Sequence, residues 1–130
     1  MENISISIHH HPVHPDVATL QFKGFIYANT LAEISKTLQT LVTAQRKKLV
    51  FDLTETNYVS SGGWGLFINT AQQLRETEGD IFLAAMKPEI YDAFELLEFH
   101  KLIRLFPTVE AALQEGFGRT QPTAPITAKA

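Results

Sequence analysis

Two serines followed by two glycines stand where a buried strand gives way to a helix, and this junction constrains the fold most. Before it, residues 48–53 (Lys-Leu-Val-Phe-Asp-Leu) are apolar on successive positions, as in a central parallel strand. After it, apolar side chains recur at helical spacing from Trp64 to Leu74. The junction predicts a parallel strand–helix unit in which Ser60 and Ser61 lie at the N-terminus of the helix.

The first part of the chain predicts an antiparallel hairpin. Ile4, Ile6 and Ile8 alternate with polar residues, which is typical of a strand with one buried face. A polar, proline-containing turn over residues 9–16 interrupts this pattern, and residues 17–22 resume it. Two adjacent strands joined by a short turn favour antiparallel pairing.

The next helix is predicted between two local signals. Thr30, with Glu33 three residues later, fits a capping box at the N-terminus. The cations of residues 46–48 suit the negative end of the helix dipole and are predicted to close the helix. Further along, Gly79 is the predicted left-handed residue after the helix that follows the serines.

The remaining elements alternate in the same way. Residues 81–85 and 102–106 are short apolar segments that predict strands. Pro88 suits the first position of a helix between them, and Thr108 is the predicted cap of a last helix.

The predicted order is strand-strand-helix-strand-helix-strand-helix-strand-helix, or ββαβαβαβα. Such alternation implies parallel pairing with right-handed crossovers, and the hairpin adds an antiparallel pair. We therefore predict one α/β domain over residues 1–117, with a mixed sheet of about five strands and about four helices. Residues 118–130 contain two prolines and lack periodicity, which predicts a disordered tail.

Composition narrows the classes of function. The chain has 130 residues, of which 45% are hydrophobic and 19% charged, as in one soluble globular domain. A net charge of −3 gives no basic footprint for nucleic acid. The absence of cysteine fits a reducing compartment, and no apolar run approaches the roughly 18 residues that span a bilayer. We predict a cytoplasmic protein without membrane insertion.

The serines allow two interpretations. A serine at a helix N-cap accepts hydrogen bonds from backbone N–H groups, so the segment Ser-Ser-Gly-Gly is readily a cap and a tight turn. The same N–H groups and the helix dipole favour negative charge, so a phosphate is also tolerated there. Composition alone favours the first interpretation.

Other candidate sites are less convincing. The cluster His9, His10, His11 and His14 lacks the spacing of a zinc site and is predicted to be a solvated turn, with no metal. The segment Gly62-Gly63-Trp64-Gly65 lacks the Lys-Ser/Thr ending of a P-loop, and Ser61 lacks a Gly-x-Ser-x-Gly elbow. We predict no enzyme activity and no cofactor. Trp64, between two glycines, is predicted to be partly exposed for a partner, whereas Phe67 is predicted to be core.

Residues 50–53 and 58–66, in the order strand, Asp, short link, serines, glycines and helix, resemble the STAS family of anti-sigma factor antagonists. Gly79 and the segments 102–106 and 108–113 are also similar, so the likeness covers roughly residues 4–117. The resemblance implies partner switching. Members bind an anti-sigma factor that is also a serine kinase, and the sigma factor is released; phosphorylation by that kinase reverses the binding, and a serine phosphatase restores it.

The resemblance also assigns residues. The family phosphoserine maps onto Ser61, with Ser60 as the alternative, although Ser60 itself occupies the position of a family acid. Tyr27 likewise replaces an acid. The implied partner-binding surface comprises Tyr27, Ser60, Ser61, Gly62, Gly63 and Trp64. Two alternatives remain: a STAS binding module without a phosphorylation cycle, in a sensory complex or regulating a transporter ATPase, and a small nucleotide-binding protein or phosphohydrolase.

Overall fold

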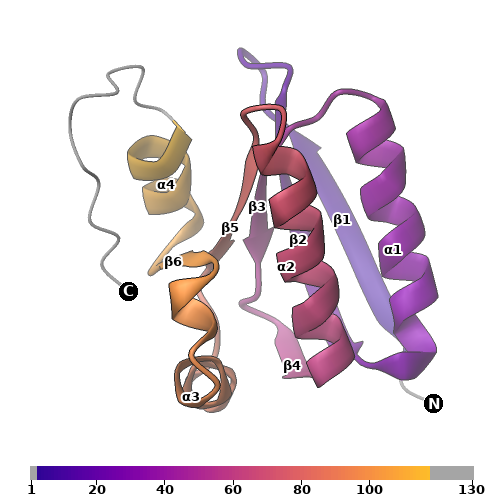
Figure 1. Cartoon of the computed structure of the whole chain (residues 1–130), viewed down its shortest axis with the longest axis vertical. Coiled ribbons are helices and arrows are strands. Elements are labelled where there is room, and N and C mark those ends of the chain that lie inside the picture. Colours follow the sequence, from indigo (N-terminus) through magenta and orange to yellow (C-terminus); the bar gives the residue numbers. More distant parts are fainter. Residues whose placement is uncertain (1–2, 118–130) are drawn as a thin grey trace.

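The structure is a computed structural model that describes residues 3–117 (Figure 1). The predicted tail, residues 118–130, lies outside the described residues. The strands are β1 (Ile4–His10), β2 (Val17–Ile26), β3 (Lys48–Asp52), β4 (Thr56–Val59), β5 (Asp80–Ala84) and β6 (Arg104–Phe106). The helices are α1 (Ala28–Thr43), α2 (Ser61–Arg75), α3 (Pro88–Leu96) and the short α4 (Val109–Ala111), which continues as a π-helical turn over Ala112–Phe117. A 3₁₀ turn covers Phe99–Lys101.

The sheet is mixed, as predicted. Its order is β1-β2-β3-β5-β6; β1 is antiparallel to β2, and the other neighbours are parallel. Ile6 pairs with Phe22 and Ile8 with Leu20, which confirms the hairpin. The structure contains one strand more than the predicted order, because β4 pairs with the second half of β2.

Helices cover the two faces of the sheet unequally. α1, α2 and α3 pack on one face, where Leu49 and Phe51 of β3 belong to the larger core. Val50, between them, points to the opposite face and packs with Phe106 and Ala112 of the C-terminal elements. Figure 1 shows α1 and α2 side by side in front of the strands. The apolar run of β3 follows from this arrangement, because both of its faces are buried.

β4 was not predicted because buried and exposed residues do not alternate along it. Asp52 ends β3, where its Oδ1 accepts a hydrogen bond from the Thr54 backbone N–H at 3.0 Å and turns the chain. Thr56 and Val59 are buried, while Asn57 and Tyr58 between them are exposed. The Thr56 hydroxyl donates to the Phe22 carbonyl at 2.8 Å, which fixes the new strand beside β2. β2 is longer than predicted because Gly24, at φ +121°, carries it through a bulge opposite β4.

Three predictions of helix ends were wrong. Tyr27, not Thr30, is the N-cap of α1; the Thr30 hydroxyl instead accepts from the Tyr27 N–H at 3.1 Å from inside the helix. α1 ends at Thr43, so the basic residues 46–48 follow it and Lys48 already belongs to β3. After α2 the left-handed residue is Glu78, at φ 69°. Gly79 is small for another reason: a Cβ there would lie 2.2 Å from the Lys47 carbonyl oxygen.

The caps at Pro88 and Thr108 are confirmed. Pro88 is the first residue of α3, and the Thr108 hydroxyl accepts from the Ala111 N–H at 3.0 Å. None of the helices within residues 3–117 combines the length and the apolar character that crossing a bilayer demands.

Candidate functional site

The pairing of β2 with β4 brings two helix N-termini together. Ile26 and Val59 are partners at the ends of these parallel strands, and the Ser60 N–H donates to the Ile26 carbonyl at 2.8 Å. The next residues, Tyr27 and Ser60, are the N-caps of α1 and α2. The structure therefore gathers Tyr27, Ser60 and Ser61 at the carboxyl edge of the sheet, although more than thirty residues separate them in sequence.

The two serines have different environments. Ser60 has extended backbone angles, and its Oγ accepts a hydrogen bond from the Gly63 N–H at 3.1 Å. Its carbonyl accepts from the Trp64 N–H at 3.0 Å, which begins the helix. Ser61 is the first residue of α2 and is exposed. Ser60 is thus the N-cap, and Ser61 presents its hydroxyl to solvent.

The first turn of α2 carries no acidic side chain. The N–H groups of Ser61 and Gly62 make no hydrogen bond with other described residues, whereas those of Gly63 and Trp64 are bonded to Ser60. Unpaired N–H groups and the positive end of the helix dipole attract anions. The site can therefore accept added negative charge without a clash with a neighbouring carboxylate on its own helix turn.

The glycines and the tryptophan divide between the surface and the core. Gly62 is exposed, whereas Gly63 is buried, and a Cβ on Gly63 would lie 2.7 Å from Cγ2 of Ile26. The prediction that Trp64 is partly exposed was wrong, since only 1% of it is accessible. Its ring centroid lies 5.5 Å from that of Phe94 and 5.4 Å from that of Phe99. Phe94 and Phe99 lie at least thirty residues after Trp64 in the sequence. Their rings cover the indole on the side where Gly63 and Gly65 provide no side chain.

Two further residues belong to this edge and were missed by the sequence analysis. Lys87 is the N-cap of α3, and its Nζ donates a hydrogen bond to Oδ1 of Asn57 in β4. Tyr58, next to Asn57, is 51% exposed. The sequence Lys87-Pro88 could have indicated the N-cap of α3. The contact between Lys87 and Asn57 could not be predicted, because it depends on the position of β4.

The predicted histidine turn is only partly correct: His11 and His14 lie between β1 and β2, at the opposite edge of the sheet, whereas His9 and His10 continue β1 and pair with Thr19 and Ala18. His11 Nδ1 accepts from the N–H groups of Val13 and His14, both at 3.1 Å. Within residues 3–117, no group of three or more His, Cys, Asp or Glu side chains is placed to hold a metal ion. His11 stabilises the turn through its two hydrogen bonds to the backbone.

Two groups with shifted pKa values also lie away from the serines, at the amino ends of their strands. Burial raises the pKa of the Asp80 carboxyl at the start of β5, against the opposing effects of the Ile81 N–H and Arg75. Burial lowers the pKa of Arg104 at the start of β6, and its guanidinium lies 5.0 Å from the ring centroids of both Phe82 and Phe106. These groups support the structure of that edge and take no part in the serine site.

Comparison with known proteins agrees with this architecture. The anti-sigma-B factor antagonist of Listeria monocytogenes is 27% identical over 103 residues, which cover 79% of this chain and 89% of the relative. An anti-sigma factor antagonist from Mycobacterium paratuberculosis has a similar structure, with a TM-score of 0.76, 22% identity, and coverage of 85% of this chain and 92% of the other. Unphosphorylated SpoIIAA superposes with a TM-score of 0.74 at 14% identity, over 90% of this chain and 100% of the other.

The family model for the STAS domain matches residues 10–112, which include every strand from β2 to β6 and the serine site. The match extends over well more than half of the 130 residues. The chain belongs to the STAS domain family.

Proposed function

We propose that this chain is a cytoplasmic anti-sigma factor antagonist that works by partner switching. Unphosphorylated, it binds an anti-sigma factor that is also a serine kinase, and the bound sigma factor is released. The kinase then phosphorylates Ser61, the complex dissociates, and a serine phosphatase resets the cycle. Membership of the STAS family and the name of the Listeria relative support this role.

The observation that carries the proposal is the difference in hydrogen bonding and exposure between Ser60 and Ser61. A kinase must reach an exposed hydroxyl that makes no structural hydrogen bond. Ser60 Oγ is engaged by the Gly63 N–H, whereas Ser61 is exposed and its hydroxyl makes no hydrogen bond within residues 3–117. Ser61 is therefore the better phosphate acceptor of the two.

The physical consequence of phosphorylation follows from the same geometry. A phosphoserine carries a charge of about −1.5 to −2. At the first residue of α2 it meets the unpaired N–H groups of Ser61 and Gly62 and the helix dipole, so the domain itself keeps its fold. A partner that lies flush over Ser61 and Gly62 would have to desolvate that charge. Burying an unpaired charge costs several kcal/mol, and each 1.4 kcal/mol is about a tenfold loss of affinity.

The binding surface in this proposal is the exposed carboxyl edge around the two helix starts. It comprises Tyr27, Ser60, Ser61 and Gly62, with the Asn57–Tyr58 pair of β4 beside them. The sequence analysis also placed Gly63 and Trp64 on this surface. Both are buried, so they pack beneath the surface and do not form part of it. Function thus rests on binding and on a charge added to the surface, without catalysis by this chain.

The test is to incubate the protein with ATP and each anti-sigma kinase encoded in its own genome, and to locate phosphate by mass spectrometry. Affinity for the same kinase is measured before and after modification by calorimetry. We expect phosphate on Ser61, its absence in Ser61→Ala, and weaker binding after modification. Phosphate found only on Ser60 would show that Ser60, and not Ser61, is the phosphorylated residue. Tight binding without any phosphorylation would instead support a STAS binding module that has no phosphorylation cycle.

A further inference from the structure

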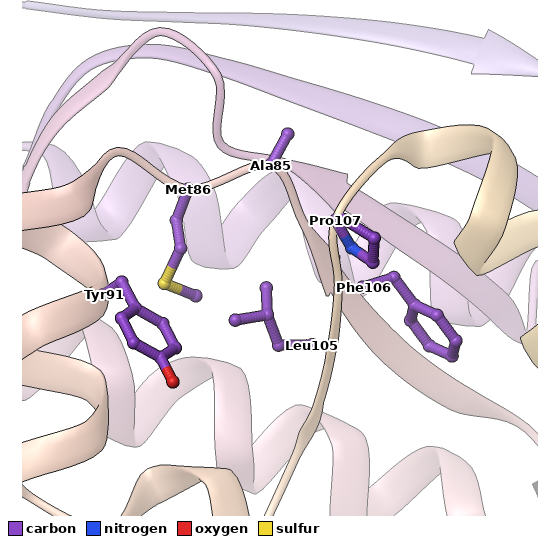
Figure 2. Close-up of a pocket in the computed structure, with 6 residues that line it drawn as sticks. All are labelled: Ala85, Met86, Tyr91, Leu105, Phe106 and Pro107. Atoms are coloured by element: carbon purple, nitrogen blue, oxygen red, sulfur yellow. The ribbon is translucent and has the colours of Figure 1, made fainter. Parts of the chain in front are cut away.

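A cavity of about 310 Å³ opens at the carboxyl ends of β5 and β6 (Figure 2). Its lining comes from the chain after β5, from α3 and from the end of β6: Ala85, Met86, Tyr91, Leu105, Phe106 and Pro107. All six side chains are aliphatic, aromatic or thioether. Figure 2 shows the Met86 thioether between the Tyr91 ring and Leu105, with Pro107 on the other side of Leu105. The Tyr91 hydroxyl and backbone groups add polar surface to this lining, so the site offers both apolar contact and hydrogen-bonding groups.

The backbone at the rim of this cavity is strained. Ala85 has φ 60°, a left-handed conformation that is unfavourable for a residue with a Cβ. Its N–H donates to the Phe106 carbonyl at 3.1 Å, which ties the rim to the end of β6. Strain of this kind persists where the surroundings hold it, and it is concentrated at binding sites and clamps. The rim of the cavity therefore has a defined backbone conformation, held by this hydrogen bond to the end of β6.

The cavity is continuous with the serine site along one edge of the sheet. β4 and β5 run parallel to β2 and β3, so their carboxyl ends lie at the same edge. Lys87, the residue after Met86, donates a hydrogen bond to Asn57 of β4. Tyr58, half exposed, follows Asn57 and lies two residues before Ser60. A partner that covers Ser61 and Tyr58 therefore reaches the cavity without leaving this edge.

We infer that this cavity receives one aromatic side chain of the anti-sigma factor that docks over Ser61, an inference that rests on the proposed function. The volume of about 310 Å³ is sufficient to hold one aromatic side chain. An incoming aromatic ring can pair with the Tyr91 ring and with the sulfur of Met86, whereas the Phe106 ring is buried on the opposite face of the sheet. Buried aromatic anchors of this kind carry much of the energy of protein interfaces.

Met86 provides a direct readout, because the chain contains only two methionines. The protein is labelled at its methionine ¹³C-methyl groups, and each genomic anti-sigma kinase that binds is titrated in, with complex formation followed by calorimetry on the same samples. An aromatic ring stacked in the cavity shifts the Met86 methyl proton signal upfield, measured against an added chemical-shift standard. A Met86 signal that stays in place or moves downfield at saturation overturns the inference.

Variants give a second measurement. Met86→Trp fills the cavity from its rim, and we expect at least a tenfold loss of affinity. Ile8→Trp makes a comparable change on β1, outside this edge, and should bind as the wild type does. Melting curves check folding; if Met86→Trp does not fold, Tyr91→Ala, which removes one wall, takes its place with the same expectation. Unchanged affinity of the cavity variant overturns the anchor but leaves the proposed function standing. Failure of the wild type to bind any anti-sigma factor overturns both.

Discussion

The Ser60 N–H donates to the Ile26 carbonyl at 2.8 Å, and this hydrogen bond fixes the start of α2 beside the start of α1. Because Ile26 and Val59 pair within the sheet, the residues that follow them are held by strands rather than by a free loop. Sites supported by regular elements keep their geometry better than sites on loops. The exposed Ser61 is therefore held at a defined position at the start of α2.

Ser60 and Ser61 should differ in their effect on stability. Ser60→Ala removes the acceptor for the Gly63 N–H, and loss of such a cap costs about 1 kcal/mol. Ser61→Ala removes an exposed hydroxyl that is not part of the cap, so the free energy of unfolding should change by less than about 0.5 kcal/mol. Urea unfolding of the two variants measures both values. Equal losses would show that Ser61 also supports the helix start.

Gly63 and Gly65 form a matched pair within one helix. An added Cβ at Gly63 would lie 2.7 Å from Ile26 Cγ2 and 3.0 Å from Val59 Cγ1, so Gly63→Ala should destabilise the domain by about 1–3 kcal/mol. No neighbouring atom lies within 4 Å of the corresponding position at Gly65. Gly65→Ala should therefore stabilise the helix by roughly 0.5–1 kcal/mol. Thermal unfolding of both variants decides it, and destabilisation by both would contradict the packing described for this turn.

Trp64→Ala should unfold or strongly weaken the domain instead of acting on binding alone. The side chain is 1% exposed and packs against Phe67, Phe94 and Phe99. Truncation of a buried aromatic residue costs about 3–5 kcal/mol. Denaturant unfolding gives the loss, with the exposed Tyr58→Ala as a control that should keep its stability. A stable Trp64→Ala protein would mean that the ring is not part of the core.

The sequence predicted those parts of the fold that depend on local patterns. Alternation at Ile4, Ile6 and Ile8 indicated the edge strand, and Pro88 and Thr108 marked helix starts, since each signal acts within a few residues. β4 escaped because its position depends on the distant contact between Thr56 and Phe22. Tyr27 and Ser60 are brought together by the same strand. The hydrophobic pattern could not predict this proximity; only the resemblance to STAS proteins assigned both residues to one surface.

The burial of Trp64 shows a second limit of local reasoning. Flanking glycines suggested access for a partner, but Phe94 and Phe99 cover the indole from a later part of the chain. The cavity beside Met86 was invisible for the same reason, because its walls come from segments that meet only at the ends of β5 and β6. Side chains that converge from distant elements leave no periodic signal in the sequence.

Ser61→Asp should weaken binding to the cognate anti-sigma kinase while the fold is kept. The carboxylate lies at the first residue of α2, where the first turn has no acid and the dipole favours negative charge, so stability should stay the same or rise by about 0.3–1 kcal/mol. A flush interface would have to desolvate the new charge, and we expect at least a tenfold loss of affinity. Ser7→Asp adds the same charge on the exposed side of β1 and is the control; it should bind like the wild type. Calorimetry measures affinity, and circular dichroism with thermal melting measures the fold. Wild-type affinity in Ser61→Asp would contradict the electrostatic block, and an equal loss in Ser7→Asp would show that net charge, rather than its position at the helix start, governs the interaction.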